Sequence, residues 1–185
     1  VNAPYSDSAA LEKFAQGVDV ISFEFENIPR AALDTVSALK PVRPRGEVLH
    51  ICQNREREKN FLRTQGFPCA PFRVVDSAEN LASALAEIGT PSVLKTADFG
   101  YDGKGQVRVA NADEARKAFK DMGSESCVLE QRIALKCEIS AVVARGADGA
   151  GRSFPVSENR HRMGILDVSI VPARVAPELA MQGEE

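Results

Sequence analysis

A glycine-rich loop is the stretch of this sequence best suited to bind an anion. The loop and its flanks read SVLKTADFGYDGKGQVRV, and the alternating apolar positions predict a strand on each side. Gly100, Gly103 and Gly105 leave backbone N–H groups free to surround a phosphate, while Lys95 and Lys104 would add positive charge. The pattern therefore indicates a phosphate site, although a flexible hairpin with a solvated lysine is equally consistent with the loop alone.

The loop differs from two familiar phosphate-binding motifs. A Walker A loop has Ser or Thr after its Gly-Lys pair, whereas Gly105 follows Lys104 here and a strand is expected next. A dinucleotide-binding fingerprint requires a helix that opens on the last glycine. Any function for the loop must therefore be argued together with the rest of the chain.

The composition is typical of a globular protein with one or two domains. The chain has 185 residues, 44% of them hydrophobic, and a formal charge of −3. The absence of a lysine or arginine run argues against nucleic acid as a partner. No apolar stretch has the length of a transmembrane helix and the first residues do not resemble a signal peptide, so we expect no membrane partner and a cytoplasmic location.

The four cysteines are predicted to be free thiols. Cys52, Cys69, Cys127 and Cys137 show no C-x-x-C spacing and stand in core-like surroundings. Disulfides or a zinc site are therefore not expected, and the thiols should be inert.

The N-terminal part is expected to be the end of an α/β domain. Helices are predicted over 8–16 and 29–39, with a buried strand over 18–25 between them. Glu24 and Glu26 would lie at the carboxyl end of that strand, where open α/β sheets bind ligands. A solvated strand end is the simpler alternative.

A densely charged helical segment follows over 47–65, with a break near Gln53. Glu56 and Lys59 are three residues apart, so they are predicted to form an exposed ion pair. Arg55 would then matter only if a ligand lies beside it.

From residue 72 the pattern predicts two helices on one face of a mainly antiparallel sheet, with the glycine loop as a flap at its edge. Asp76 and Asn111 each precede a Glu by three residues, which predicts a capping box at the start of each helix. Strands are expected over 127–130 and 138–145. After a turn, SFPVS and VSIVPA are predicted strands, with ENRHRMGIL connecting them.

Nine segments, in order along the chain, carry a resemblance to a known family. They are FEFENIP, QNREREKNFL, GFPCAP, VLKT, GYDGKGQ, VLEQRI, CEIS, VVAR and ENRHRMGIL. The set resembles the central part of the 5-(carboxyamino)imidazole ribonucleotide synthases, ATP-grasp ligases of purine biosynthesis. The resemblance implies a partial ATP-grasp fold, of the α/β and α+β classes. It also implies a homodimeric enzyme that uses ATP and bicarbonate, through carboxyphosphate, to carboxylate aminoimidazole ribonucleotide.

The resemblance also implies an ATP site. The implied set is Arg55, Lys95, Gly100, Tyr101, Asp102, Gly103, Lys104, Gly105, Gln106, Glu130, Gln131, Arg132, Ile133, Glu138 and His161. Within it, Lys95 and the flap would hold the phosphates, which agrees with the need for fixed donors where charge develops. Residues 130–133 would follow the adenine edge, and Glu138 would bind the ribose hydroxyls.

Substrate and catalytic roles are implied for fewer residues. Glu24, Tyr101 and Lys104 resemble contacts for the imidazole ribonucleotide. Asp102 and Lys104 resemble catalytic groups near the carboxyphosphate. The carboxylates that hold Mg²⁺ in this family would lie beyond residue 185, so no metal ligand is expected here and the chain alone is expected to be inactive.

The chain is interpreted as a fragment, because it begins without Met and ends where a helix is predicted to begin. The expected parts are the end of an N-terminal domain (1–45), a linker with helices (46–71), the flap subdomain (72–145) and the start of a second ATP-grasp subdomain (146–185).

Two alternatives stay open. Another ATP-grasp ligase, such as a formate-dependent glycinamide ribonucleotide transformylase or a biotin carboxylase, would share the lysine, the flap and the hinge. GYDGKGQ and ENRHRMGIL favour the synthase over these enzymes. The second alternative is a nucleotide-binding module without catalysis.

Overall fold

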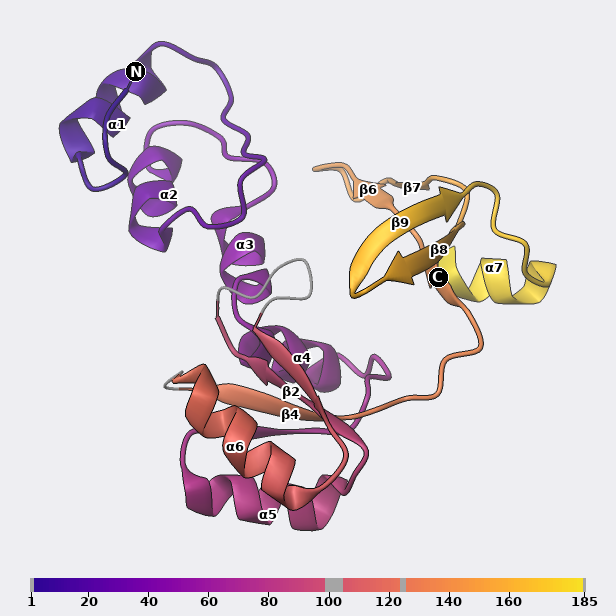
Figure 1. The fold of residues 1–185 in the computed structure, drawn as a ribbon. Helices are drawn as coiled ribbons and strands as arrows, with labels where there is room; N and C mark the ends of the chain where they lie inside the picture. Colours follow the sequence, from indigo (N-terminus) through magenta and orange to yellow (C-terminus); the bar gives the residue numbers. More distant parts are fainter. Residues whose placement is uncertain (1, 99–104, 124–125, 185) are drawn as a thin grey trace. The chain divides into compact units, whose positions relative to one another are not determined.

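The computed structural model describes residues 2–98, 105–123 and 126–184 (Figure 1). The chain divides into two compact units, of which the first ends at Arg132 and the second begins at Ile133. The division of the chain into four parts, expected from the sequence, remains a prediction. No helix in the described part of the chain is long and apolar enough to cross a membrane.

The first unit opens with three helices, α1 (Ser8–Gln16), α2 (Arg30–Ser37) and α3 (Gly46–Cys52). They enclose a small core that includes Ala15, Leu33 and Val36. The Asp7 carboxylate accepts a hydrogen bond from the Ala10 N–H at 3.0 Å and caps α1, as a short polar side chain at this position commonly does.

The strand predicted over 18–25 is wrong. Only an isolated parallel bridge joins Ile21 to Val42, and Val20 and Phe25 are 58% and 52% exposed. A pair of short extended segments is marginal unless further strands pair with it. In the described residues none does, so only Ile21 is fully buried in the core, and Val18 and Phe23 pack against it partly buried.

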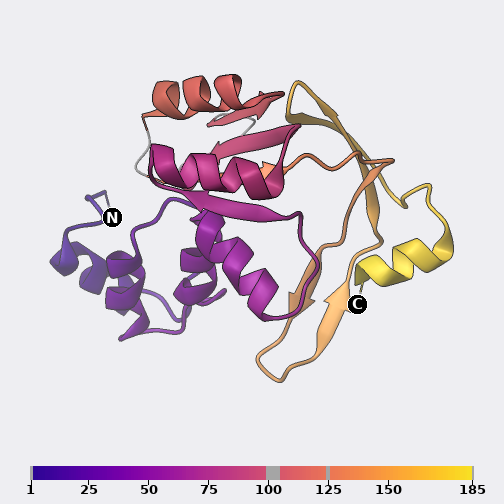
Figure 2. The ribbon, with the colours of Figure 1, turned by 90° about the horizontal axis from the view of Figure 1, so that it is seen from below.

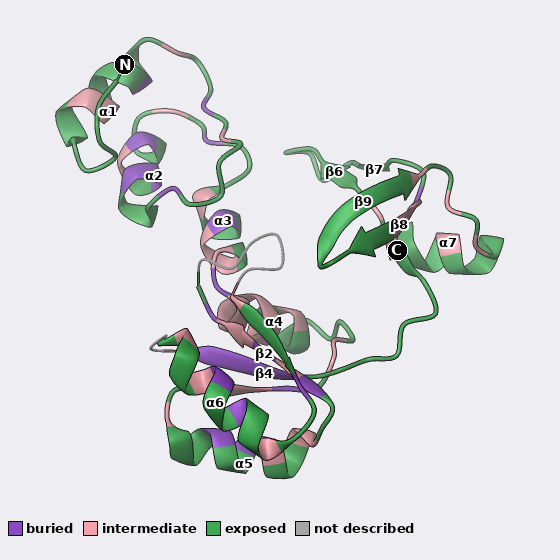
Figure 3. Ribbon diagram, in the orientation of Figure 1, coloured by how far each residue is buried: buried purple, intermediate pink, exposed green. Residues whose placement is uncertain are grey.

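The centre of the first unit is an antiparallel sheet in the order β1-β4-β2-β3. Its strands are β1 (Phe72–Val75), β2 (Ser92–Thr96), β3 (Gln106–Val109) and β4 (Cys127–Gln131). Two helices, α5 (Ala78–Ile88) and α6 (Ala112–Met122), cover one face side by side (Figure 2). Leu81, Leu94 and Leu129 are fully buried between the helices and the sheet. Figure 3 shows buried residues on β4 and on parts of α5 and α6. The predicted arrangement of two helices on one face is confirmed.

The other face of the sheet packs against α4 (Arg55–Thr64), which lies on the side opposite α5 and α6 (Figure 1). In the register Phe72 lies opposite Glu130, and Lys95 lies opposite Val128. Residues two apart on a strand share a face. Lys95 and Glu130 therefore both project from the face that α4 covers.

The helix caps differ in one place from the prediction. Ser77, not Asp76, caps α5, because its hydroxyl accepts the Asn80 N–H. The sequence placed the cap one residue early because Asp76 and Ser77 both favour this position. Asn111 caps α6 as predicted, by accepting the Glu114 N–H at 3.0 Å.

The second unit contains a sheet in the order β5-β8-β9, a separate hairpin of β6 and β7, and a helix. The bounds are β5 (Glu138–Ser140), β6 (Val143–Arg145), β7 (Gly151–Ser153), β8 (Ser157–Arg162), β9 (Ile165–Ile170) and α7 (Pro177–Glu184).

Three strand predictions in the second unit are wrong. SFPVS is not a strand, because Ser153 ends β7, Ser157 begins β8 and the residues between them are in no strand. The single strand over 138–145 is two strands, because β5 pairs with β8 whereas β6 pairs with β7. The ENRHRMGIL segment is not a connection but a hairpin, in which β8 and β9 meet at a turn over Met163 and Gly164. Both turn residues have positive φ, 52° and 82°, as the type I′ hairpin turn requires. The sequence did not predict β8 because all of its residues are polar or charged.

Candidate functional site

A buried carboxylate with two cations lies on the face of the sheet that α4 covers. The Glu130 Oε2 atom is 3.0 Å from Lys95 Nζ and 3.3 Å from Lys59 Nζ. The side chains of Glu130, Lys59 and Lys95 are 9%, 14% and 24% exposed. Two ammonium groups against one carboxylate leave an excess of one positive charge, which suits an anionic ligand.

The second oxygen of the Glu130 carboxylate, Oε1, lacks the contacts that Oε2 makes. Oε1 is buried and has no hydrogen-bond partner among the described residues. Buried polar atoms nearly always have a partner, and an unsatisfied one costs about 1–3 kcal/mol. The carboxylate therefore carries two contacts on one oxygen and retains acceptor capacity on the other.

Arg55 and Asn54 tie the start of α4 to the end of β2. The Arg55 guanidinium donates to the Thr96 carbonyl at 2.6 Å, and the Arg55 N–H donates to the Ala97 carbonyl at 2.9 Å. The Asn54 amide donates to Asp98 at 2.9 Å. These bonds fix the chain that leads from Lys95 to the glycine-rich segment.

The predicted flap residues fall into two groups. Gly100, Tyr101, Asp102, Gly103 and Lys104 lie outside the described residues. Gly105 has φ of 64° and its carbonyl accepts the Thr96 N–H at 2.8 Å, while Gln106 lies opposite Lys95 in the register. The described ends of the loop thus close an antiparallel hairpin at the edge of the sheet, as predicted.

The predicted adenine-edge residues continue from the end of β4. The Gln131 N–H donates to the Pro71 carbonyl and the Arg132 N–H donates to the Pro91 carbonyl. Ile133 begins the second unit and is about half exposed.

Glu138 and His161 meet within the second unit. His161 Nδ1 lies 3.2 Å from Glu138 Oε2, across the pairing of β5 and β8. The structure therefore brings together two residues that the resemblance assigned to the nucleotide, and it does so inside one sheet.

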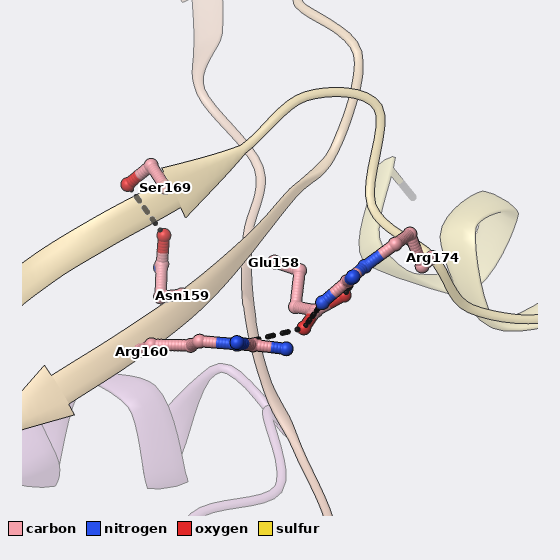
Figure 4. Close-up of polar contacts among 5 residues, drawn as sticks. All are labelled: Glu158, Asn159, Arg160, Ser169 and Arg174. Atoms are coloured by element: carbon pink, nitrogen blue, oxygen red, sulfur yellow. Dashed lines mark hydrogen bonds and ion pairs between the residues drawn. The ribbon is translucent and has the colours of Figure 1, made fainter.

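The same sheet contains a charged group that the sequence did not indicate. Glu158 accepts two hydrogen bonds from the Arg174 guanidinium, at 2.9 and 2.6 Å, and Arg160 lies 3.5 Å from it (Figure 4). The hydrogen bonds from Arg174 are the main cause that lowers the pKa of Glu158 to about 2. No spacing signal could reveal this pair, because its members are sixteen residues apart on different segments.

Glu24 is exposed, but the loop that follows it is held near Arg55. The Gln53 side chain donates to the Glu26 and Ile28 carbonyls, both at 2.7 Å. A cavity of about 150 Å³ lies here, and its lining includes Glu26, Asn27, Gln53 and Arg55. The structure thus places the polar loop after Glu24 and the start of α4 around one cavity.

The most important residue that sequence reasoning missed is Lys59. The prediction of an exposed pair with Glu56 is wrong, since Lys59 is largely buried and pairs with Glu130. Its Nζ also lies 5.4 Å from the centre of the Phe72 ring. The available signal was its position four residues after Arg55, which puts both side chains on one face of α4.

No group of three or more His, Cys, Asp or Glu side chains that could hold a metal ion occurs in the described ranges. The four cysteines are free, as predicted. The prediction of core-like surroundings is wrong for Cys52 and Cys137, which are exposed.

Comparisons with known proteins agree with this architecture. Residues 60–185 match the family model of the ATP-grasp domain, and residues 1–53 match that of the ribonucleotide synthetase preATP-grasp domain. The chain therefore belongs to the ATP-grasp family.

Individual relatives are similar along nearly the whole chain. The N5-carboxyaminoimidazole ribonucleotide synthase of Brucella melitensis is 40% identical over 180 residues, which cover 96% of this chain and 50% of that protein. A crystal structure of N5-carboxyaminoimidazole synthetase from Staphylococcus aureus complexed with ADP is 34% identical. It superposes with a TM-score of 0.91 over 98% of this chain and 49% of that one.

A biotin carboxylase domain from Hydrogenobacter thermophilus shares the fold, with a TM-score of 0.80 over 98% of this chain and 45% of that one, but only 18% identity. The chain spans about half the length of these relatives.

Proposed function

We propose that this chain forms the nucleotide-binding part of an enzyme that carboxylates 5-aminoimidazole ribonucleotide. The reaction uses ATP and bicarbonate and yields N5-carboxyaminoimidazole ribonucleotide, ADP and phosphate. The observation that carries the proposal is the pairing of Lys95 with buried Glu130 beside the glycine-rich segment, in a chain 40% identical to a synthase named for this product.

Lys95 and the flap are proposed to hold the ATP phosphates. The excess positive charge around Glu130 supports this role, because it attracts a polyanion before any contact forms. Residues 100–106 would then supply backbone donors, with Asp102 and Lys104 beside the carboxyphosphate. Arg55, whose hydrogen bond to the Thr96 carbonyl fixes the chain after Lys95, is proposed to approach the nucleotide as well.

The remaining site residues divide between adenosine and the second substrate. Residues 130–133 are proposed to follow the adenine edge, with Glu138 and His161 near the ribose. Glu24, together with Tyr101 and Lys104, is proposed to contact the imidazole ribonucleotide. The cavity beside Gln53 and Arg55 supports a binding role for the loop after Glu24.

Mg²⁺, when bound with ATP, would neutralise charge on the phosphates, and its carboxylate ligands are proposed to lie in the half of the relatives that this chain does not match. We further propose that the intact enzyme is a homodimer and is cytoplasmic. The four-part organisation expected from the sequence belongs to the same proposal.

A coupled assay for ADP tests the proposed function. The intact polypeptide that carries this chain is mixed with ATP, Mg²⁺ and bicarbonate, with or without aminoimidazole ribonucleotide. We expect ADP release that depends on both bicarbonate and the ribonucleotide. The two related ligases are tested by exchanging substrates, with glycinamide ribonucleotide plus formate in one reaction and biotin in the other. ADP release with either of these sets, and none with aminoimidazole ribonucleotide, would overturn the proposal.

A further inference from the structure

The two lysines that contact Glu130 are not equivalent, and the difference decides which of them can move to a ligand. Lys95 stands next to the end of β2, two residues before Ala97, and is the more exposed of the two lysines. Lys59 comes from α4, is the more buried one and lies over the Phe72 ring. One lysine is therefore placed to move toward a ligand, and the other is held in place.

A phosphate that draws Lys95 Nζ toward the glycine-rich segment weakens its contact with Glu130 and, if the ammonium moves far enough, breaks it. If Lys95 were the only cation there, its departure would leave a largely buried carboxylate without a countercharge, which is strongly unfavourable. Lys59 contacts the same oxygen at 3.3 Å, so a neutral pair would remain after Lys95 has left. The second cation thus lowers the free energy needed to release the first.

We propose that Lys59 is a positioning residue that keeps the charge of Glu130 compensated while Lys95 is transferred to a nucleotide phosphate. This inference rests on the proposed function, because it takes Lys95 to be a phosphate ligand. Lys59 itself touches neither the nucleotide nor the reacting atoms. It acts through Glu130, and the effect of removing it must therefore depend on the charge of Glu130.

That dependence gives a test by double-mutant cycle on ATP binding by the intact polypeptide, measured by calorimetry. Lys59→Met ties Lys95 to Glu130, so we expect ATP affinity to fall by about 10- to 100-fold, the range of couplings between contacting charges. In a Glu130→Gln background Lys95 is already released, and we expect Lys59→Met to change affinity there by less than about threefold. Lys59→Arg, which keeps the charge, should bind ATP nearly as the parent does.

Lys117→Met is the matched control, because Lys117 is also a helix lysine paired with a carboxylate, Asp121, but an exposed one. It should leave ATP affinity unchanged. Thermal melts of each variant identify any that fail to fold. If Lys59→Met does not fold, Lys59→Gln takes its place in the cycle, because it also removes the charge but keeps a hydrogen-bond donor for Glu130. A loss of about 10- to 100-fold is again expected in the parent, and of less than about threefold in the Glu130→Gln background.

Two failures are distinguishable. If Lys95→Met leaves ATP binding unchanged, the proposed function of Lys95 fails and this inference fails with it. If Lys95→Met abolishes binding but Lys59→Met behaves like Lys117→Met, only the role of Lys59 is overturned. An equal loss from Lys59→Met in the parent and in the Glu130→Gln background would also overturn it, since it would show a structural effect that does not pass through Glu130.

Discussion

Glu130 in the first unit and Glu158 in the second are both carboxylates that meet two cations, yet their contacts differ. Glu158 uses both oxygens in a bidentate contact with Arg174, and Arg160 lies close to one of them. Glu130 presents one oxygen to both Lys59 and Lys95, and its other oxygen is buried without a partner in the described structure.

The two arrangements suit different tasks. A planar guanidinium that satisfies both carboxylate oxygens gives a fixed geometry, and here it holds β8 to the segment that follows β9. Two flexible lysines on one oxygen form an arrangement in which one contact can be exchanged for another. We infer that Glu158 maintains a structure, whereas Glu130 takes part in a change of partners.

The largest effect is expected when the ammonium group of Lys95 is removed from the Glu130 cluster. In the intact polypeptide, Lys95→Met should lower ATP affinity or turnover by about 100-fold or more, the usual loss when a donor to a developing charge is removed. Its melting temperature should stay close to that of the parent, because Lys59 still compensates Glu130. Equal kinetics for mutant and parent would contradict the assignment.

Removal of the carboxylate itself should affect stability. Glu130→Ala leaves the partly buried ammonium groups of Lys59 and Lys95 without their countercharge. We expect a loss of about 2 kcal/mol in the free energy of unfolding, below the full value for deeply buried pairs because both lysines can reach water. Chemical denaturation of the chain measures it, with Glu79→Ala on the exposed side of α5 as control. A loss no larger than that of the control would show that Glu130 is not a buried ionic centre.

The contrast between the clusters also marks what could be predicted from the sequence. The sheet with two helices was predictable because β2, β4, α5 and α6 carry periodic apolar residues bounded by caps and glycines. Lys95 was identified from its place before the glycine-rich loop, and Glu130 from the resemblance. Their contact was not, because it depends on the register of β2 against β4.

Lys59 and the strand β8 were mispredicted for a common reason. Both are polar, and the environment of each is set by distant parts of the chain. Lys59 lies against a face of the sheet, and β8 pairs with β5 and β9. Rules that use only neighbours in the sequence predict that charged residues lie in solvent. The strand predicted over 18–25 is the opposite case. Its apolar residues favour a strand, but in the described structure its pairing is limited to one isolated bridge.

A smaller effect, dependent on pH, should distinguish the Glu158 cluster. The folded-state pKa of Glu158, about 2, lies below its ordinary value of 4.5, so the contact stabilises the fold above about pH 5. That stabilisation is lost as the pH falls through 4.5 toward 2. In Arg174→Met the pKa of Glu158 should return toward its ordinary value, because the hydrogen bonds from Arg174 are the main cause of the shift.

Melting temperatures of parent and Arg174→Met between pH 7 and about pH 2 test this. We expect the parent to be the more stable protein at neutral pH and the two curves to converge as the pH approaches 2. A difference that stays constant over the whole range would show that Arg174 contributes by packing rather than by charge. ATP affinity at neutral pH should change little in this variant, in contrast with Lys95→Met.

The smallest expected effect concerns a neutral contact in the same hairpin. The Ser169 hydroxyl donates to the Asn159 side chain at 2.9 Å, beside Glu158 but without any charge (Figure 4). Ser169→Ala should lower the free energy of unfolding by about 0.5 kcal/mol, because the bond is exposed and water replaces it. The loss should be the same at every pH, since neither group titrates.

Parallel melts of Ser169→Ala and Arg174→Met over one pH series make the comparison direct, because both variants weaken the attachment of β9 or the segment after it to β8. If Ser169→Ala also converged with the parent at low pH, the pH dependence would belong to the whole hairpin and not to the Glu158 carboxylate, and the assignment of the low pKa to the Arg174 contact would be wrong.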